Sequence, residues 1–533
     1  MTPLLQTLGG LGLFLYGMAA MTSGLRKLAG DRLRHWLAAS TRSPLSGAVT
    51  GAAVTAVIQS SSATTVTVIG FVSAGLMTFQ QSLGLIFGAN VGTTATAWLV
   101  ALVGFKLQLS TAALPLLFIA SLAYLFKTSK GLRGFGKALA GFSLIFLGIS
   151  YLQDGLGGYG DQFDLSRWSG DSVSGKFALI LIGAVIAMVT QSSSVAVAAA
   201  LTGLNTGLID LVQTTSIIIG ANIGTTSTAL LATIGGSTAA RRTGLAHLFY
   251  NVIAAVAALL LLPGYLAAAH RWFAGTTASS PEAIAAMFHT TFNVLGLAIV
   301  LPFTRPFGRF IERLIPEKEE PLTAIFPRHL LDDPHTAVAA LESGCRKLTA
   351  VLMTEAARAL GPGAHTPGFA KTTLDSLRSA VDAARDFAIE IGEHESDHAD
   401  IDAGRIFACI HILDHLDRML DRAHDSKRLQ AARAVPGLAE KTTAVGHEFR
   451  LLADQFEKPA TESTPSTVME TLAAELENDK SGFRHQAIQS AAARVTTAQQ
   501  LDETLDAHRW LRRIAYHAAR IALYSQTDAQ IAE

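Results

Sequence analysis

Two identical polar runs interrupt apolar sequence and carry the side chains best suited to binding chemistry. The run Gln59-Ser60-Ser61-Ser62 recurs 132 positions later as Gln191-Ser192-Ser193-Ser194. Residues 43–105 include no charged side chain, and residues 177–240 include only Asp210. Because hydroxyl and amide groups can both donate and accept hydrogen bonds, the runs predict a binding site built without fixed charge.

The same offset relates a second pair of motifs. Gly-Ala-Asn-Val-Gly-Thr-Thr at 88–94 matches Gly-Ala-Asn-Ile-Gly-Thr-Thr at 220–226, and Gly51 matches Gly183. Self-similarity at one fixed offset indicates an internal duplication. Apolar units that are duplicated, and interrupted by Gly-rich polar stretches at matching positions, point to the binding site of a transporter.

We expect both copies to contribute binding groups. The candidates are Gln59, Ser60, Ser61, Ser62, Thr64, Thr65, Asn90, Thr93 and Thr94 in the first copy, and Gln191, Ser192, Ser193, Ser194, Asn222, Thr225 and Thr226 in the second. A site without fixed charge cannot bury a bare anion cheaply, but it can bury an anion together with cations. Hydroxyl and carbonyl oxygens suit Na⁺, and hydroxyl and N–H groups suit an oxyanion such as phosphate. The chemistry therefore favours co-transport of an oxyanion with a small cation.

The copies differ just after the polar run. The second continues Val195-Ala196-Val197, where the first has Ala63-Thr64-Thr65. Two interpretations follow: the two sites hold different ligands, or the ion stoichiometry differs.

The elements that must position these groups are membrane helices. Segments long and apolar enough to cross a bilayer, about 20 residues each, lie near 4–24, 80–104, 109–126, 138–153, 208–235, 244–270 and 281–303. The stretches 44–75 and 177–203 contain the polar runs. We interpret them as re-entrant hairpins, because irregular backbone is tolerated at membrane depth only inside protein or beside a cavity. The predicted fold is an all-α membrane protein with about seven full spans.

The charges divide the chain. Residues 1–315 carry 18 Lys/Arg and 8 Asp/Glu, whereas the remainder carries 24 and 34. We therefore predict a transmembrane transport domain at 1–315 (repeat 1 about 44–126, repeat 2 about 177–270), a linker at 316–321 and an acidic helical domain at 322–533. The cysteines, Cys345 and Cys409, are expected to be buried free thiols. Basic residues flank the membrane segments, so no nucleic-acid partner is expected.

Loop charges set the orientation. The basic clusters are Arg26, Lys27, Arg32, Arg34 and Arg42; Lys127, Lys130, Arg133 and Lys137; Arg241 and Arg242; and Arg305, Arg309 and Arg313. Placing all four in the cytoplasm satisfies the positive-inside rule. The loop 154–176, with Asp154, Asp161, Asp164 and Asp171, then lies outside, as does the N-terminus. Three spans separate the hairpins, so the repeats are expected to be inverted, in the inner membrane, with the C-terminal domain cytoplasmic.

These motifs, with Phe288-His289-Thr290-Thr291-Phe292-Asn293 and the stretch 246–251, resemble the type II sodium–phosphate cotransporter family over about residues 5–305. The resemblance implies that Gln59–Ser62 and Gln191–Ser194 bind Na⁺ and phosphate, with no organic cofactor. His289 and Asn293 would support the site. The alternative is that these two residues, with His247 and Asn251, only shape the scaffold through interhelical hydrogen bonds.

Apolar residues recur at helical spacing beyond residue 321, which predicts a bundle of about four to six helices. This part resembles the PhoU-like domain often fused to bacterial members of the family. Such domains can hold metal on acidic patterns, which here are Glu393 with Asp397 and Asp417 with Asp421. The alternative is a solvated helix face.

We predict a bacterial sodium-coupled phosphate symporter that works by alternating access, in the lipid bilayer and with a second subunit forming part of the scaffold as a homodimer. The alternative is a phosphate sensor, in which transport is secondary and the cytoplasmic domain reports occupancy to phosphate-signalling proteins. An enzyme is disfavoured, because the duplicated cores lack an ionisable residue to act as acid or base.

Overall fold

The computed structural model of the protein is helical, with no strand in the residues that it describes. These are 2–39, 43–73, 75–106, 110–126, 130–158, 172–234, 236–272, 280–316, 322–326, 328–332, 334–361, 368–393, 403–435, 437–457 and 468–525. The chain divides into unit 1, Met1–Ser73 with Met77–Lys318, and unit 2, Glu319–Glu533 with Ala74–Leu76. Most of the expected linker, and Asp161, Asp164 and Asp171 of the expected outer loop, lie outside the described residues.

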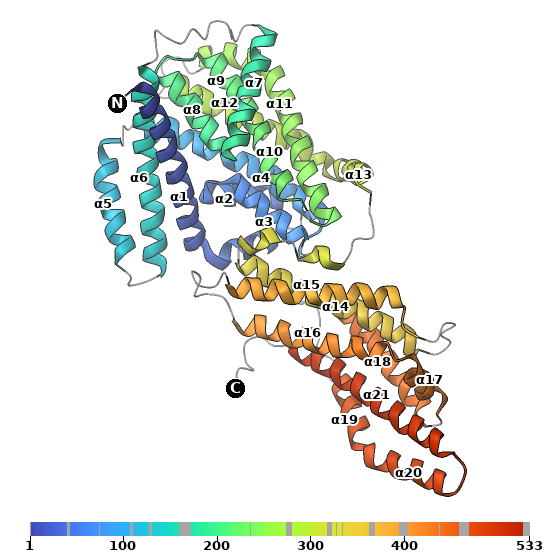
Figure 1. The fold of residues 1–533 in the computed structure, drawn as a ribbon. Coiled ribbons are helices and arrows are strands. Elements are labelled where there is room, and N and C mark those ends of the chain that lie inside the picture. The colour runs from blue at the N-terminus through green and yellow to red at the C-terminus, as the bar shows by residue number, and fades with distance from the viewer. Residues whose placement is uncertain are drawn as a thin grey trace. The chain divides into compact units, whose positions relative to one another are not determined.

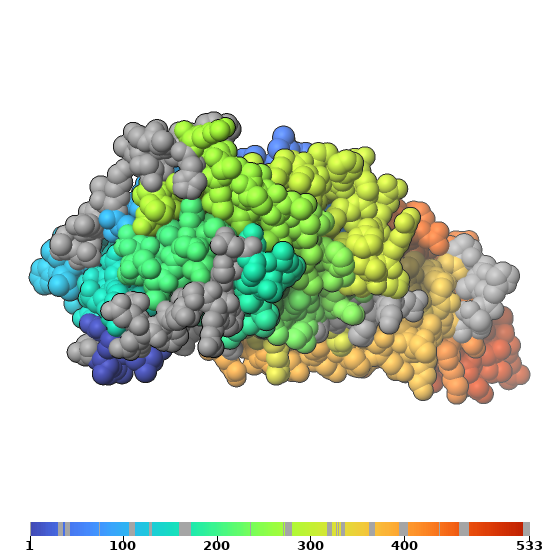
Figure 2. All heavy atoms as spheres, turned by 90° about the horizontal axis from the view of Figure 1, so that it is seen from above, coloured from blue at the N-terminus to red at the C-terminus, as the bar shows by residue number. Residues whose placement is uncertain are grey.

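Unit 1 holds thirteen labelled α-helices within its described part (Figure 1). They are α1 Pro3–Ala39, α2 Pro44–Ile58, α3 Ser61–Ser73, α4 Phe79–Trp98, α5 Ser110–Leu125, α6 Lys130–Gly157, α7 Val173–Thr190, α8 Ser193–Asn205, α9 Leu211–Gly224, α10 Thr226–Leu231, α11 Thr238–Trp272, α12 Pro281–Val300 and α13 Thr304–Leu314. A π-helical turn, Leu99–Lys106, extends α4. The second half of the unit forms most of the face seen in Figure 2.

Six helices in the described part of the chain are long and apolar enough to cross a membrane, namely Pro3–Ala29, Phe79–Phe105, Gly131–Gly157, Val173–Thr190, Thr238–Ala269 and Pro281–Leu314. The expected count of about seven is therefore corrected: two expected spans are missing, and Val173–Thr190, which we expected to belong to a re-entrant hairpin, is long enough to span. The segment expected at 109–126 forms a helix of only 16 residues, α5. The segment expected at 208–235 is broken into α9 and α10 at Thr225. Hydropathy predicts the length of an apolar segment, but it does not predict where a helix within that segment ends.

Helices α1 and α6 pack along each other through glycines seven residues apart. On α1 these are Gly10, Gly17 and Gly24, and on α6 they are Gly134, Gly141, Gly148 and Gly155. A Cβ at Gly17 would lie 2.8 Å from the carbonyl oxygen of Gly141, and one at Gly141 would lie 2.2 Å from the backbone nitrogen of Met21. Small residues let membrane helices approach this closely, so the pair forms a tight support beside the duplicated part.

The duplicated segments repeat the same local structure. Helices α2 and α7 end at Gln59 and Gln191, which share a left-handed backbone conformation with φ of 61° and 53°. Helices α3 and α8 follow and end before the matching turns at Gly75 and Gly207, with φ of 71° and 73°. Capping boxes then start α4 and α9 at equivalent positions. Each of the segments 44–75 and 177–203 thus contains two helices with a break at the polar run, and we refer to each helix–break–helix segment as a hairpin.

The hairpins also pack alike on the helices that follow them. A Cβ at Gly88 on α4 would lie 1.9 Å from the carbonyl oxygen of Ala48 on α2. At the 132-residue offset, a Cβ at Gly220 on α9 would lie 1.9 Å from the carbonyl oxygen of Ile180 on α7. Contacts this short exclude any side chain. Gly88 and Gly220 therefore determine how closely the helices that carry the Gly-Ala-Asn motifs, α4 and α9 (the motif helices), approach α2 and α7.

Unit 2 is a helical bundle with its own hydrophobic core. Its helices are α14 Pro334–Leu360, α15 Lys371–Glu393, α16 Ala403–Ala423, α17 Ser426–Ala434, α18 Ala439–Glu457, α19 Val468–Asn478, α20 Lys480–Ala492 and α21 Ala498–Tyr524. Cys345 and Cys409 are free and buried, as expected. A hydrogen bond to Cys409, together with burial, raises the pKa of the Cys345 thiol above its ordinary value.

Candidate functional site

The two helix breaks meet inside unit 1. Ser62 Oγ, at the start of α3, donates to the carbonyl oxygen of Gln191 over 3.3 Å. Ser62 Oγ also lies 3.4 Å from Thr225 Oγ1, at the point where α9 ends. Three predicted site residues from separate parts of the sequence are therefore in contact, as the duplication led us to expect.

A second chain of hydroxyls links the breaks from the other side. Thr96 Oγ1 on α4 donates to Gln59 Oε1 over 3.0 Å, and Ser194 Oγ on α8 donates to Thr96 Oγ1 over 3.3 Å. Sequence reasoning missed Thr96. The signal was present, since the offset pairs Thr96 with Thr228, the next shared hydroxyl after the Gly-Ala-Asn motif.

The junction also collects helix ends of both kinds. Helices α3 and α8 begin there, at Ser61 and Ser193, which are 6% and 2% exposed. Helix N-termini favour anions, because their first N–H groups lack intrahelical partners. Helices α2 and α7 end at the same place, and their last carbonyls favour cations. The arrangement can therefore receive an anion and a cation with no charged side chain.

The difference between the copies at Thr64 has a structural explanation. Thr55 Oγ1 on α2 donates to Thr64 Oγ1 on α3 over 3.0 Å, which ties the first hairpin together. The equivalent residues of the second hairpin are Ala187 and Ala196, both buried. A hydroxyl pair in one hairpin thus corresponds to a methyl pair in the other. Thr64 is used in helix packing, and its absence from the second copy removes no free ligand group.

Other predicted residues turn toward their own helices. The hydroxyls of Thr93, Thr94 and Thr226 donate to the carbonyl oxygens of Ala89, Val91 and Ile223, respectively. These threonines lie close to the breaks, and each hydroxyl donates to a backbone carbonyl three or four residues earlier in the chain. Thr65, by contrast, is buried and its hydroxyl has no hydrogen-bond partner in the described part of the chain.

The two motif asparagines are buried and contact polar side chains of other helices. Asn222 Nδ2 on α9 donates to Asn251 Oδ1 on α11 (2.9 Å) and to Asn293 Oδ1 on α12 (3.1 Å). Asn90 Oδ1 lies 3.4 Å from His247 Nε2. Asn222, Asn251 and Asn293 thus join three helices behind the breaks, which matches the scaffold interpretation. His289 is also buried, and both of its ring nitrogens lack a partner in the described part of the chain.

In unit 2, two of the four acidic residues predicted to hold metal are paired with arginine. Arg378 Nη1 donates to Asp417 Oδ1 over 2.5 Å, and its Nη2 donates to Asp421 Oδ1 over 2.6 Å. Glu393 is exposed at the end of α15, and Asp397 lies outside the described residues. No group of three metal-ligating side chains occurs within the described ranges. Asp417 and Asp421, paired with Arg378, fit the solvated helix face that we gave as the alternative.

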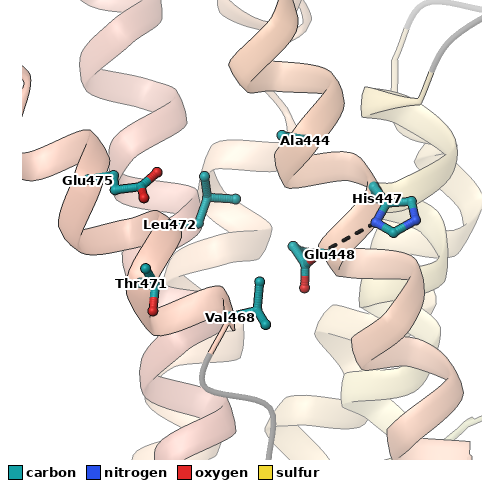
Figure 3. Close-up of a pocket in the computed structure, with 7 residues that line it drawn as sticks. All are labelled: Ala444, His447, Glu448, Val468, Thr471, Leu472 and Glu475. Atoms are coloured by element: carbon teal, nitrogen blue, oxygen red, sulfur yellow. Dashed lines mark ion pairs between the residues drawn. The ribbon is translucent and has the colours of Figure 1, made fainter.

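Two further features of unit 2 bear on its chemistry. His415 and His517 are buried with their Nδ1 atoms 2.9 Å apart. The pKa of His517 is lowered to about 4, mainly by burial and further by the nearby positive charge of Arg422. A pocket of about 260 Å³ lies between α18 and α19, lined by Ala444, His447, Glu448, Val468, Thr471, Leu472 and Glu475 (Figure 3). Glu448 contacts His447 at one side of this pocket, and Glu475 projects from the facing helix.

The comparisons with known proteins place the chain among transporters. The family model described as Na+/Pi-cotransporter matches residues 13–154 and 162–299, which hold both hairpins and both motif helices. The chain belongs to this family. It is therefore a multi-pass membrane protein, and the family match covers both copies of the duplicated segment.

The relatives of this cotransporter-family chain include bacterial and animal proteins. Protein YqeW of Bacillus subtilis, described as uncharacterized, is 33% identical over 308 residues, 57% of this chain and 96% of its own length. The putative inorganic phosphate export protein YjbB of Escherichia coli is 29% identical over 347 residues, 64% of this chain and 61% of its own. The human sodium-dependent phosphate transport protein 2B is 35% identical over 101 residues, 19% and 15% of the two chains. No solved structure matches.

Proposed function

We propose that the protein carries inorganic phosphate across the bacterial inner membrane together with Na⁺. The observation that carries this proposal is the junction of the two breaks, where Ser62 contacts Gln191 and Thr225. Uncharged hydroxyls, two helix N-termini and two helix C-termini gather there. Phosphate bound at the N-termini would leave negative charge uncompensated in a low-dielectric site, and Na⁺ at the carbonyl ends would offset it.

Alternating access follows from the duplication. The hairpins would be re-entrant and inverted, so that the breaks meet near the middle of the bilayer and each repeat faces one side. Gln59–Ser62 and Gln191–Ser194 would hold the ligands, with Asn222 and Asn293 keeping the helices behind them in place. A second copy of the chain would complete the scaffold.

The direction of flux has two candidates. The relative YjbB is named a phosphate export protein, which favours export. The relative named sodium-dependent phosphate transport protein 2B favours coupling to Na⁺. With an inward Na⁺ gradient, movement of Na⁺ and phosphate in the same direction drives phosphate import. We therefore propose sodium-coupled symport as the first candidate and export as the second.

Unit 2 would be a cytoplasmic, PhoU-like regulatory domain. The alternative role for the whole protein is a phosphate sensor whose output passes through unit 2. Removing residues 322–533 separates these roles: a carrier retains flux, whereas a sensor loses its output while phosphate binding persists.

The test is radiolabelled phosphate flux in proteoliposomes that contain the purified protein in both orientations. Uptake with an inward Na⁺ gradient is compared with uptake when choline replaces Na⁺, and efflux is measured from preloaded vesicles. The matched variants are Ser193→Ala, at the buried start of α8, and Ser121→Ala, an exposed serine on α5. Na⁺-dependent uptake that Ser193→Ala reduces strongly, and Ser121→Ala does not, supports the proposal. Equal flux with Na⁺ and choline removes Na⁺ coupling, and an absence of flux in both favours the sensor.

A further inference from the structure

The two copies of the motif hold equivalent residues in two different hydrogen-bonding arrangements. In the first copy, Thr96 donates to Gln59 Oε1 and accepts from Ser194 Oγ. Its counterpart at the 132-residue offset is Thr228, whose Oγ1 is buried with no hydrogen-bond partner within the described ranges. The same threonine is thus satisfied in one copy and unsatisfied in the other.

The glutamines that end the first helix of each hairpin differ in the same sense. Gln59 is half-buried and held by Thr96, and its Nε2 also donates to the carbonyl oxygen of Ala56 over 2.5 Å. Gln191 is exposed. The backbone at both glutamines is alike, with φ of 61° and 53°. The asymmetry therefore lies in the side-chain partners and not in the turns themselves.

The serines and helices that surround the two threonines differ in the same way. Ser194 reaches Thr96, whereas its counterpart Ser62 bonds to the Gln191 carbonyl and to Thr225 instead of Thr228. Helix α4 continues past Thr96 into the π-helical turn, but α9 ends before Thr228 and restarts as α10. Thr96 is thus hydrogen-bonded to both breaks, whereas Thr228, within the described ranges, is bonded to neither.

We infer that Thr96 and Thr228 are alternating positioning residues of the transport cycle. The chain Gln59–Thr96–Ser194 holds the arrangement described here, and the equivalent chain Gln191–Thr228–Ser62 holds the opposite one. In a carrier built from two like repeats, access changes as one repeat moves against the other. We take the two repeats to exchange their hydrogen-bonding arrangements in this step, so that the present arrangement of each repeat is the next arrangement of the other. The unpartnered hydroxyl then passes from Thr228 to Thr96. The inference rests on the proposed function, since it assumes that the repeats exchange during transport.

Valine removes the hydroxyl of threonine and keeps its shape, which gives the two positions opposite effects. Thr96→Val deletes both hydrogen bonds that favour the present arrangement. Thr228→Val deletes an unpartnered hydroxyl here and two hydrogen bonds of the exchanged arrangement. One net hydrogen bond changes an equilibrium constant about fivefold. We expect the populations of the two arrangements to shift by at least about fivefold in opposite directions.

The experiment measures how fast a cysteine at each break is alkylated by a hydrophilic maleimide, with the full chain in nanodiscs so that both faces are accessible. Cys345 and Cys409 are first replaced by serine, and the probes are the equivalent substitutions Ser60→Cys and Ser192→Cys, each in a separate protein. Both positions are half-buried. The readout is the ratio of the Ser192→Cys rate to the Ser60→Cys rate, with no phosphate or Na⁺ present.

Thr96→Val should lower this ratio and Thr228→Val should raise it, each about fivefold, and the double variant should return near the parent. A ratio that moves the same way in both variants, or changes less than twofold in both, overturns the inference. If a valine variant fails to fold, as judged by size-exclusion chromatography, alanine takes its place with the same expectations. Opposite shifts without phosphate flux would overturn the proposed substrate but keep the exchange. Sodium-dependent phosphate flux without opposite shifts would support the proposed substrate and overturn the exchange.

Discussion

Replacing Thr64 with alanine tests whether the extra hydroxyls of the first hairpin bind a ligand or hold its helices together. Thr64 Oγ1 accepts from Thr55 over 3.0 Å and donates to the carbonyl oxygen of Ser60 over 3.2 Å. The second hairpin has alanine at both equivalent positions, Ala187 and Ala196. If the hydroxyls serve packing, the first hairpin should tolerate the same pair of alanines but not one alone.

The structure gives the expected size of the effect. Thr55 is fully buried, at 0% exposed, so Thr64→Ala leaves a buried hydroxyl without its partner. Leaving such a group unpaired costs about 1–3 kcal/mol, whereas replacing both partners by apolar groups can be nearly neutral. We expect Thr64→Ala to lower the free energy of unfolding by about 2 kcal/mol and the double variant Thr55→Ala/Thr64→Ala by less than about 1 kcal/mol. The two substitutions should therefore be coupled by about 1 kcal/mol or more.

The assay combines thermal unfolding in nanodiscs with phosphate flux in proteoliposomes for the parent, both single variants and the double variant. Thr64→Ser, which keeps the hydroxyl, is the control and should remain close to the parent. The double variant should recover both stability and flux relative to Thr64→Ala. A double variant as stable as the parent that still carries no phosphate would refute the packing argument and return Thr64 to the ligand site.

Three further outcomes follow from other parts of the molecule. Gly220→Ala places a Cβ 1.9 Å from the Ile180 carbonyl oxygen, so the yield of monodisperse protein should collapse, whereas Gly12→Ala, which meets nothing within 4 Å, should leave the yield unchanged. Ser193→Ala removes a hydroxyl at the start of α8 and should reduce Na⁺-dependent uptake about tenfold, the effect of losing a hydrogen bond to a charged ligand; unchanged uptake at equal expression would exclude the hydroxyl from the site. Because the pKa of His517 is lowered to about 4, the unfolded chain binds the proton more readily, and the stability of unit 2 should fall as the pH drops from about 6.5 toward 4. Denaturant unfolding at pH 7 and pH 5 would measure this, and His517→Phe should reduce the difference.

The duplication was readable from the sequence because the residues that preserve the offset also fix the backbone. Gln59 and Gln191 take the same left-handed turn, and Gly75 and Gly207 take a second one. A conformation with positive φ limits the residue types that can occupy it, so its position persists in the sequence. The pair of helix breaks at matching positions could therefore be expected from the pattern alone.

The number of spans could not be read in the same way. Hydropathy is similar whether an apolar segment forms one helix or two, and the break at Thr225 depends on what the neighbouring hairpin contacts there. The support formed by α1 and α6 was missed for a different reason. Its signal is the seven-residue spacing of Gly10, Gly17 and Gly24, which is visible only when glycine, rather than apolar character, is followed along the helix.

The hydrogen-bond partners could not be predicted from the sequence, because a hydroxyl can act as a donor or as an acceptor. Thr96 donates to Gln59 and accepts from Ser194 at the same time, and no residue type reveals which arrangement a given copy adopts. This freedom matters at a site that has no charged side chain. Its hydroxyls pair with one another, as Ser62 does with Thr225, whereas a buried arginine or aspartate would need a permanent partner. Ligands must then replace contacts that contribute about 1 kcal/mol each, which keeps binding reversible, and a carrier must release what it binds.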